Sequence, residues 1–276
     1  MSIQTDPALS VASSPIASTA RTWVVVPTYN ESENIRPFVS ELLTAVPEAN
    51  VLVVDDNSPD GTGELADELA AGQPRVEVRH RTAKTGLGAA YREGFRQVLG
   101  MPGCERIVQM DCDFSHDPRD VGRLLAPLDE GYDVVIGSRY VDGGSTPGWG
   151  LRRRVISRTG SIVARALLGL SFRDLTGGFK AWSASTLSGI DLDGGYANGY
   201  GFQIEMTYRA HAGGARIAEV PITFRDRTAG TSKMTAGIAA EALLAVLRLR
   251  ATSSGRVSRR RSRPSARGAR RPVDPR

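Results

Sequence analysis

The stretch VVVPTYNESENI, residues 24–35, begins as a strand and ends abruptly in polar, turn-forming residues. A second stretch, VLVVDDNSPDGT at residues 51–62, repeats this design and ends its strand in Asp55 and Asp56. Unbroken runs of valine are typical of parallel strands that are covered on both faces. Sheets of this kind bind ligands at the carboxyl ends of their strands. The polar residues after each strand therefore predict a binding site.

The same alternation of strand and helix continues to about residue 140. Strands are predicted at 22–26, 51–55, 76–80, 106–111 and 132–139, and helices at 31–46, 63–72, 86–100 and 117–131. Further on, we predict helices at 151–170, 199–214 and 234–250, a strand at 215–227 and a turn-rich segment at 174–183. The pattern indicates an α/β fold of the Rossmann type, with a mainly parallel central sheet and peripheral amphipathic helices.

Composition separates the ends of the chain from its body. The net charge is +5, but residues 252–276 contain nine arginines and one aspartate, which leaves −3 for residues 1–251. The first 20 residues are rich in Ser, Ala, Thr and Pro and lack the pattern of a signal peptide. We expect a disordered leader at 1–20, one domain at 21–251 and a disordered arginine-rich tail at 252–276.

These features also exclude some classes of function. The two cysteines, Cys104 and Cys112, fit a reducing compartment and do not have the spacing of a metal-binding pair. No apolar run is long enough to span a bilayer. A specific nucleic-acid binder is disfavoured because the basic charge lies in the tail and the body carries −3.

The segment MDCDFSH, residues 110–116, contains the most informative acids. Asp111 and Asp113 follow a predicted strand with one residue between them. Alternate side chains of an extended segment share a face, so both carboxylates can approach one point. Two acids at one point favour a cation between them, and hard oxygen ligands suit Mg²⁺ or Mn²⁺ bridging phosphates. The alternative for an isolated Asp-x-Asp is a solvated acidic turn.

Two other motifs allow two interpretations each. Asp55 and Asp56 have the position of acids that contact a ribose or a base edge, and they also begin a segment of turn formers, residues 57–61. The segment GLGAA at 86–90 resembles a phosphate-binding loop, but it lacks the full glycine pattern and does not follow the first strand. Close packing at a helix start is the better interpretation of these glycines.

An ordered set of motifs resembles a known family. The motifs are PTYNE (27–31), DDNSPDGT (55–62), GLG (86–88), DCDFSHDP (111–118), GSRY (137–140), DLTGGFK (174–180), GYGFQIEM (199–206) and FRDRTAGTSKM (224–234). Together they resemble the polyprenol-phosphate mannosyltransferases, the dolichol-phosphate mannose synthases of glycosyltransferase family two. The resemblance covers about residues 22–240 and implies a GT-A fold.

The resemblance implies roles for individual residues. The base and ribose pocket would be lined by Pro27, Tyr29, Glu31, Val54 and Asp56. Asp111 and Cys112 would contact the donor and Asp113 would bind Mg²⁺ or Mn²⁺, while Ser115 stands where some members place a glutamine ligand. The acceptor phosphate or donor sugar would meet Ser138, Arg139, Arg152, Arg153 and the adjacent Arg154, and Arg227 and Lys233 would hold phosphates.

The implied reaction is inverting transfer of mannose from GDP-mannose to a polyprenyl monophosphate. The second pKa of such a phosphate is about 6, so the acceptor is largely deprotonated near neutral pH and no general base is assigned. Three alternatives remain: a UDP-sugar donor, such as UDP-glucose, with the same acceptor; a non-catalytic module that binds nucleotide sugars; and a nucleic-acid binder, suggested by the tail alone.

A lipid acceptor without a spanning segment implies a peripheral enzyme. Two predicted helices, at about 155–170 and 234–250, are apolar enough to lie at an interface. The arginine-rich tail adds attraction to anionic lipids. We therefore expect a cytoplasmic enzyme that associates with the cytoplasmic face of the membrane, with a separate membrane-anchoring protein as a further candidate partner.

Overall fold

The computed structural model describes residues 21–194, 197, 199–226 and 244–251. The predictions of a disordered leader and tail, and most of the predicted helix at 234–250, lie outside these residues. The strands are β1 (Thr22–Thr28), β2 (Asn50–Asp55), β3 (Val76–His80), β4 (Arg106–Gln109), β5 (Val134–Ser138), β6 (Lys180–Ser183) and β7 (Ile217–Pro221). The helices are α1 (Ile35–Ala45), α2 (Thr62–Gly72), α3 (Leu87–Leu99), α4 (Val121–Asp129), α5 (Leu151–Leu168), α6 (Ala184–Ser188) and α7 (Tyr200–Ala212), with a 3₁₀ turn η1 (Pro118–Asp120) and a helix at 244–251.

The strands of the described residues form one seven-stranded sheet in the order β3-β2-β1-β4-β6-β5-β7. All neighbouring pairs are parallel except those of β6, which runs antiparallel to both β4 and β5. This arrangement confirms the predicted α/β fold with a mainly parallel sheet. Chain connections reverse direction around β1 and β4, so the carboxyl ends of these strands border a crevice where ligands of such sheets bind.

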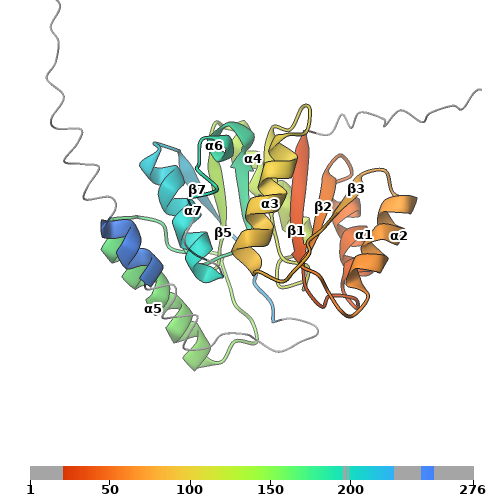
Figure 1. The fold of residues 1–276 in the computed structure, drawn as a ribbon. Coiled ribbons are helices and arrows are strands. Elements are labelled where there is room, and N and C mark those ends of the chain that lie inside the picture. The colour runs from red at the N-terminus through yellow and green to blue at the C-terminus, as the bar shows by residue number, and fades with distance from the viewer. Residues whose placement is uncertain (1–20, 195–196, 198, 227–243, 252–276) are drawn as a thin grey trace, which may run out of the picture.

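The valine runs are buried because helices cover both faces of the sheet (Figure 1). Alternate residues of β1 point to opposite sides: Val24 and Val26 pack with Phe38 of α1, whereas Val25 packs with Phe95 of α3. Helices α1 and α4 contribute to the first core, and α3 and α7 contribute to the second. Period-two alternation with both faces covered leaves no polar face, which explains the unbroken apolar sequence.

The segment at 174–183 corrects one expectation. We predicted a turn-rich segment without a strand there, but Lys180–Ser183 form β6 in the middle of the sheet. Trp182 lies opposite Ile107 of β4 and Val134 of β5, and it is fully buried. The strand has only four residues and follows two glycines, so its local pattern does not distinguish it from a turn.

Helix α3 approaches the sheet closely at one glycine. A Cβ atom on Gly94 would lie 2.6 Å from Cγ1 of Val25 and 3.0 Å from Cγ2 of Val54. We expect Gly94→Ala to lower the free energy of unfolding by about 1–3 kcal/mol, because the added methyl group overpacks this contact. Denaturant unfolding measures the change.

Gly160 of α5 provides the matched control. A Cβ atom on Gly160 would meet nothing within 4 Å among the described residues. Gly160→Ala is therefore expected to keep the free energy of unfolding or to raise it by up to about 1 kcal/mol. Equal effects of the two substitutions would contradict the close contact between α3 and the sheet.

Helix α5 and the helix at 244–251 lie side by side, away from the central sheet (Figure 1). Val246 packs with Ala164 of α5, and both contact a small cluster that includes Ile204 of α7. Arg250 donates a hydrogen bond from Nη1 to the carbonyl oxygen of Leu167. None of the helices in the described ranges is both long and apolar enough to cross a membrane.

Candidate active site

The turns after β1 and β2 are tied to each other. Three consecutive backbone N–H groups after β1 donate hydrogen bonds to side chains after β2. The pairs are Asn30 to Ser58 Oγ at 3.1 Å, Glu31 to Thr62 Oγ1 at 2.9 Å and Ser32 to Asp60 Oδ2 at 3.1 Å. The short polar side chains of the NSPDGT segment therefore hold the PTYNE turn in place, which accounts for the turn formers in both motifs.

Left-handed backbone conformations occur beside three strand ends. Asn30, Asn57 and Phe114 have φ of 58°, 60° and 59° and follow β1, β2 and β4. Asparagine tolerates this region, but a phenylalanine there is strained. The Phe114 ring packs against Phe38 with centroids 5.5 Å apart. Strain of this kind clusters at functional sites, where the surrounding structure compensates for it.

Asp55 has a structural role in its turn. Its carboxylate accepts hydrogen bonds from Thr28 Oγ1 at 3.1 Å, Ser58 N at 3.0 Å and Ser58 Oγ at 2.6 Å. Asp55 is also buried. These contacts join the ends of β1 and β2 and match the turn interpretation of the sequence.

Asp56 closes the loop that precedes α3. Its carboxylate accepts from Arg81 Nη1, from Thr85 N at 3.3 Å and from Gly86 N at 3.2 Å. Asp56 is buried, and Arg81 also bonds Glu93 at 2.9 Å. The structure therefore places Asp56 at the end of β2 and connects it to the GLG motif, whose glycine amide it binds.

The predicted base-pocket residues border the same strand ends. Pro27 pairs with Val54 across β1 and β2, and Val54 is fully buried. The ammonium group of Lys84 lies 3.4 Å from the centroid of the Tyr29 ring. Sequence reasoning did not single out Lys84, which lies in the loop between β3 and α3. Glu31 accepts a hydrogen bond from Asn34 Nδ2 at 2.7 Å.

The acid pair follows β4, as the sequence predicts. Asp111 Oδ1 accepts a hydrogen bond from the hydroxyl of Tyr91 at 3.1 Å, and its backbone N–H donates to Nδ1 of His116 at 3.2 Å. Burial raises the pKa of Tyr91 well above its ordinary value, and the charges of Asp111 and Asp113 add to this effect. Tyr91 therefore keeps its proton and donates to Asp111.

The Cys112 thiol is influenced by acids that follow both β1 and β4. Burial raises the pKa of its thiol well above the ordinary value, and the charges of Glu31, Asp113 and Asp111 raise it further. The thiol is therefore protonated and buried between strand ends that carry three acids. This concentration of negative charge is the physical reason to expect a bound cation.

The residues at the end of β4 fit a divalent metal that is coordinated partly by the protein and partly by a substrate. Asp113 is buried and accepts a hydrogen bond from Ser115 N at 3.0 Å. The hydroxyl oxygen of Ser115 is buried and has no hydrogen-bond partner among the described residues. No cluster of three or more His, Cys, Asp or Glu within the described ranges could hold a metal alone. The donor set of carboxylates and a hydroxyl suits Mg²⁺ or Mn²⁺ completed by phosphate oxygens.

His116 has a structural role in the turn that follows β4. It is buried, and its ring stacks on Phe179 with centroids 5.0 Å apart. Burial lowers its pKa, although the charges of Asp111 and Asp113 oppose this shift. The ring is therefore neutral at pH 7 and accepts the backbone hydrogen bond of Asp111.

Arg139 is held by a buried carboxylate. Its Nε and Nη2 donate to Asp174 Oδ2 and Oδ1, both at 2.7 Å, and its backbone N–H donates to Oδ2 at 3.0 Å. The two side chains are 4% and 0% exposed. Asp174 belongs to the DLTGGFK motif, so this motif fixes the arginine of the GSRY motif. Ser138, which precedes it, is fully buried, and its hydroxyl accepts from Tyr140 N at 3.4 Å.

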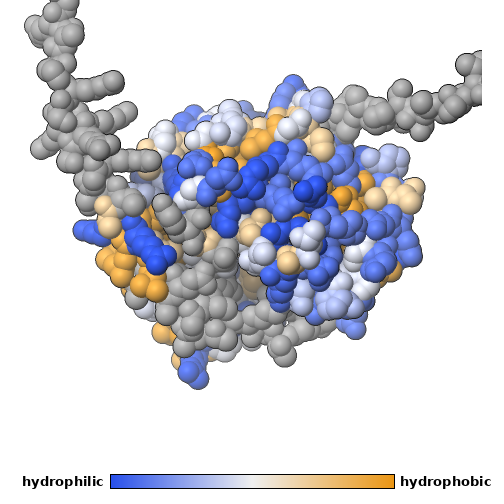
Figure 2. All heavy atoms as spheres, viewed as in Figure 1, coloured by the Kyte–Doolittle hydropathy of each residue, from blue (hydrophilic) through white to orange (hydrophobic). Residues whose placement is uncertain are grey.

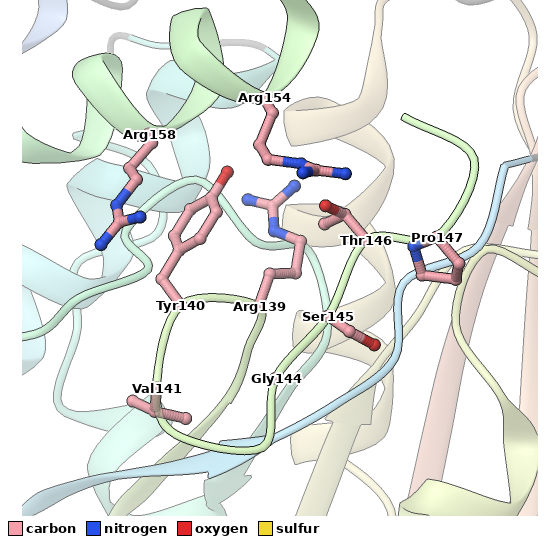
Figure 3. Close-up of a pocket in the computed structure, with 9 residues that line it drawn as sticks. All are labelled: Arg139, Tyr140, Val141, Gly144, Ser145, Thr146, Pro147, Arg154 and Arg158. Carbon is pink, nitrogen blue, oxygen red and sulfur yellow. The ribbon is translucent and has the colours of Figure 1, made fainter. Parts of the chain in front are cut away.

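A pocket of about 440 Å³ opens beside Arg139 (Figure 3). Arg154 and Arg158 reach over it from α5, and the loop of Gly144 to Pro147 forms its other wall. Among the described residues, the lining of this pocket includes three arginines and no acid. Tyr140 stays fixed because its hydroxyl bonds Ser157 Oγ at 2.6 Å. The lining predicts an anionic ligand.

The three arginines at the start of α5 have different surroundings. Arg154 lines the pocket, whereas Arg152 is exposed and neither it nor Arg153 is among the lining residues. Arg153 pairs with Asp226, and its guanidinium lies 4.0 Å from the centroid of the Trp149 ring. Sequence reasoning missed Arg158, although its helical spacing of four from Arg154 indicates a shared face. Arg227 and Lys233 lie outside the described residues.

Comparison with known protein families identifies the family of this chain. A family model described as "Glycosyl transferase family 2" matches residues 23–188. The chain belongs to glycosyl transferase family 2. It is therefore a glycosyltransferase, and the matched residues include both strand-end turns, the acid pair and the arginine-lined pocket.

Two relatives confirm the resemblance to the polyprenol-phosphate mannosyltransferases of that family. The chain is 48% identical to the polyprenol monophosphomannose synthase of Mycolicibacterium smegmatis over 84% of this chain and 87% of the relative. It is 50% identical to the undecaprenyl-phosphate mannosyltransferase of Micrococcus luteus over 83% of this chain and 93% of the relative.

Solved structures support the fold. Glucosyl-3-phosphoglycerate synthase from Mycobacterium tuberculosis, in complex with Mn²⁺, UDP and phosphoglyceric acid, superposes with a TM-score of 0.61 at 20% identity. That match covers 89% of this chain and 84% of the other. A complex of the same enzyme with Mg²⁺ and UDP has a TM-score of 0.59 at 20% identity and covers 89% and 85% of the two chains. At this identity the likeness shows the GT-A fold alone.

Proposed function

We propose that this protein transfers mannose from GDP-mannose to the phosphate of a polyprenyl monophosphate, with inversion at the sugar carbon. The names of the two relatives support the sugar and the acceptor class. The observation that carries the proposal is the arginine-lined pocket close to the acid pair. The two sites share a neighbour: the centroid of the Phe224 ring lies 5.3 Å from the Arg139 guanidinium and 5.3 Å from the centroid of the His116 ring, and His116 accepts a hydrogen bond from the backbone of Asp111.

The donor would lie across the ends of β1, β2 and β4. Its guanosine would occupy the region of Pro27, Tyr29, Glu31, Val54 and Asp56, and its diphosphate would lie beside Asp111 and Cys112. Asp113 and Ser115 would hold Mg²⁺ or Mn²⁺, and the charge of that ion would neutralise the diphosphate leaving group. The complexes of glucosyl-3-phosphoglycerate synthase with Mn²⁺ or Mg²⁺ and UDP support a divalent metal in this fold.

The acceptor phosphate would bind in the pocket of Arg139, Arg154 and Arg158, next to Ser138. A phosphate oxygen would attack the anomeric carbon while the bond from that carbon to the donor diphosphate breaks. The attacking group is already an anion near neutral pH, so the protein needs to align it rather than deprotonate it. One displacement converts an α-linked donor into a β-linked product. Arg227 and Lys233 would hold phosphate charge during this step.

The absence of an assigned general base gives the test of the acceptor. We expect transfer from GDP-mannose to polyprenyl monophosphate and none to the corresponding free polyprenol, whose hydroxyl requires deprotonation. The measurement is the amount of radiolabel in the organic phase with each acceptor, with the linkage of the product assigned by NMR. Comparable labelling of the alcohol, or an α-linked product, would overturn the proposed mechanism.

Helix α5 and the helix at 244–251 also support a place at the membrane surface. Every large hydrophobic side chain that is exposed within the described residues lies on these two helices. They are Leu151, Val155, Ile156, Ile162, Val163, Leu244 and Leu247. Figure 2 shows apolar surface gathered over the two helices. Arginines of the same helices that lie outside the pocket, such as the exposed Arg152, would face the phosphates of anionic lipids.

This surface makes a prediction for membrane binding. The double substitution Leu244→Glu and Leu247→Glu should weaken sedimentation with vesicles of anionic phospholipid by about tenfold or more, because two exposed leucines lose their burial in lipid. Ala71→Glu, on an exposed position of α2, adds the same kind of charge on the other side of the sheet and should have no effect. Equal sedimentation of all variants would favour attachment through a separate anchoring protein.

A further inference from the structure

A buried row of polar side chains runs through the sheet behind the acid pair. Its members are Trp182 and Lys180 of β6, Gln109 of β4 and Gln203 of α7. All four are at most 1% exposed. Such a network is costly unless its members satisfy one another, so its hydrogen bonds determine the direction in which each amide points.

The indole of Trp182 fixes the first amide. Its Nε1–H can only donate, and it donates to Gln109 Oε1 at 2.9 Å. The amide nitrogen of Gln109 must then point the other way. It donates to the carbonyl oxygen of Gly178 at 2.9 Å and to Gln203 Oε1 at 2.7 Å.

The orientation of Gln203 follows from that of Gln109. Its Oε1 accepts from Gln109 Nε2 and also from Lys180 Nζ at 3.2 Å, while Lys180 bonds the Gln203 backbone carbonyl at 2.9 Å. Burial lowers the pKa of Lys180 to about 7, against the effect of Asp174, and both forms of the amine retain N–H groups that donate. The Nε2 group of Gln203 is therefore directed away from this network.

The Nε2 group is buried and has no hydrogen-bond partner among the described residues. Its surroundings are given by Gly178, which has no side chain to fill the space. A Cβ atom on Gly178 would lie 3.6 Å from Gln203 Nε2 and 3.4 Å from both Asp111 Oδ2 and His116 Cε1. The amide of Gln203 and the carboxylate of Asp111 thus approach one point at the end of β4.

A group at this point meets a donor on one side and an acceptor on the other. The amide nitrogen only donates and the carboxylate only accepts. An anion would be repelled by Asp111, and a metal ion would gain nothing from an N–H group. A hydroxyl group suits both partners, because it accepts from the amide and donates to the carboxylate.

We propose that Gln203 binds the transferred sugar by donating a hydrogen bond from Nε2 to one of its hydroxyl groups, which in turn donates to Asp111. This inference rests on the proposed function, because it assigns the sugar part of the donor to the end of β4. It gives Gln203 of the FQIEM motif a direct contact with substrate. It also explains why Gly178 leaves space beside Asp111.

Two substitutions separate this contact from the support of the fold. Gln203→Glu keeps an oxygen for Gln109 and Lys180 but replaces the donating nitrogen with an oxygen. Gln203→Met removes the amide and adds no charge beside Asp111. Each should lower kcat/KM for GDP-mannose by about ten- to hundredfold, whereas the affinity for GDP, which has no sugar, should stay within about twofold of the wild type.

Thr207→Val is the matched control, because it removes the hydrogen bond of 2.9 Å that the buried Thr207 hydroxyl donates to the Gln203 backbone carbonyl and leaves the side-chain row that orients the amide intact. It should lower the free energy of unfolding, but kcat/KM for GDP-mannose and the affinity for GDP should both stay near their wild-type values. Loss of GDP binding in the Gln203 variants, in parallel with loss of GDP-mannose binding, would instead indicate a structural role and overturn the inference.

Deoxy analogues of GDP-mannose give the decisive readout. Each lacks one hydroxyl of the sugar, and one of them should lose about ten- to hundredfold in kcat/KM with the wild type. For that analogue, Gln203→Met should cause no further loss, because the partner of the amide is already absent. If the loss caused by Gln203→Met and the loss caused by the missing hydroxyl multiply for every analogue, the proposed contact is overturned. The Gln203 amide would then bind a buried water instead of the sugar. Absence of wild-type turnover with GDP-mannose would show instead that the proposed function has failed, and the inference with it.

Discussion

Replacing Asp113 with alanine is expected to reduce sugar transfer by at least a hundred- to thousandfold while the fold is retained. Asp113 is buried at the end of β4, where Ser115 N donates to its carboxylate and the Ser115 hydroxyl is without a partner among the described residues. Loss of this carboxylate removes the anchor that we assign to the metal, so the diphosphate leaving group loses its counter-charge. Initial rates with saturating GDP-mannose and polyprenyl phosphate measure the effect.

The control for this substitution is Asp129→Ala. Asp129 ends α4 and forms an exposed ion pair with Arg106, so its loss should leave the rate unchanged. Binding of Mn²⁺ in the presence of GDP, followed by electron paramagnetic resonance, gives an independent readout and should be lost only in Asp113→Ala. Turnover near the wild-type rate in Asp113→Ala would overturn the metal assignment.

Replacing Asp174 with asparagine is the second substitution with a large expected effect. It leaves the buried Arg139 guanidinium without its counter-charge, which costs about 3–5 kcal/mol of the free energy of unfolding. Transfer should fall as well, because Asp174 holds Arg139 against the acceptor pocket through bonds of 2.7 Å. Denaturant unfolding and initial rates measure the two effects.

An exposed ion pair of the same region is the control. Asp142→Asn removes the partner of Arg173, but Asp142 is fully exposed, so the free energy of unfolding should hardly change. If Asp174→Asn were no more destabilising than Asp142→Asn, the buried pair would not support the pocket.

The same pair makes stability dependent on pH. Burial alone would raise the pKa of the Asp174 carboxyl, but the Arg139 guanidinium and its hydrogen bonds hold the pKa below the ordinary value. Because the folded-state pKa is the lower one, this stabilisation is complete above the ordinary pKa of aspartic acid, about 4, and is lost as pH falls through the folded-state value. The difference in stability between wild type and Asp174→Asn should therefore shrink in acid.

Much of the fold follows from patterns that are local in sequence. Runs such as VVV at 24–26 and VLVV at 51–54 indicate buried parallel strands, and turn formers such as Pro59 and Gly61 locate their ends. Strand β6 was missed because only pairing with β4 and β5 makes it a strand. Its four residues follow Gly177 and Gly178 and have no pattern of their own.

The candidate site divides in the same way. The acids at the ends of β2 and β4 could be predicted, because their positions follow from the strands that precede them. The partner of Arg139 could not, since Asp174 lies 35 residues away and meets it only through the folded loop. The direction of the Gln203 amide depends on Trp182 of β6 and Gln109 of β4, which are far from α7 in sequence, so no motif around Gln203 reveals it.

The central claim is that the acid pair and the arginine-lined pocket together move mannose from a nucleotide to a lipid phosphate. The measurement that tests it most directly is transfer of radiolabelled sugar from GDP-mannose, UDP-glucose and UDP-N-acetylglucosamine into an organic-extractable lipid. Each reaction contains polyprenyl phosphate and is run with and without EDTA. We predict labelling from GDP-mannose alone, and only without EDTA. Labelling from a UDP-sugar would contradict the donor, and no labelling from any of the three in the presence of membranes would contradict the catalytic role.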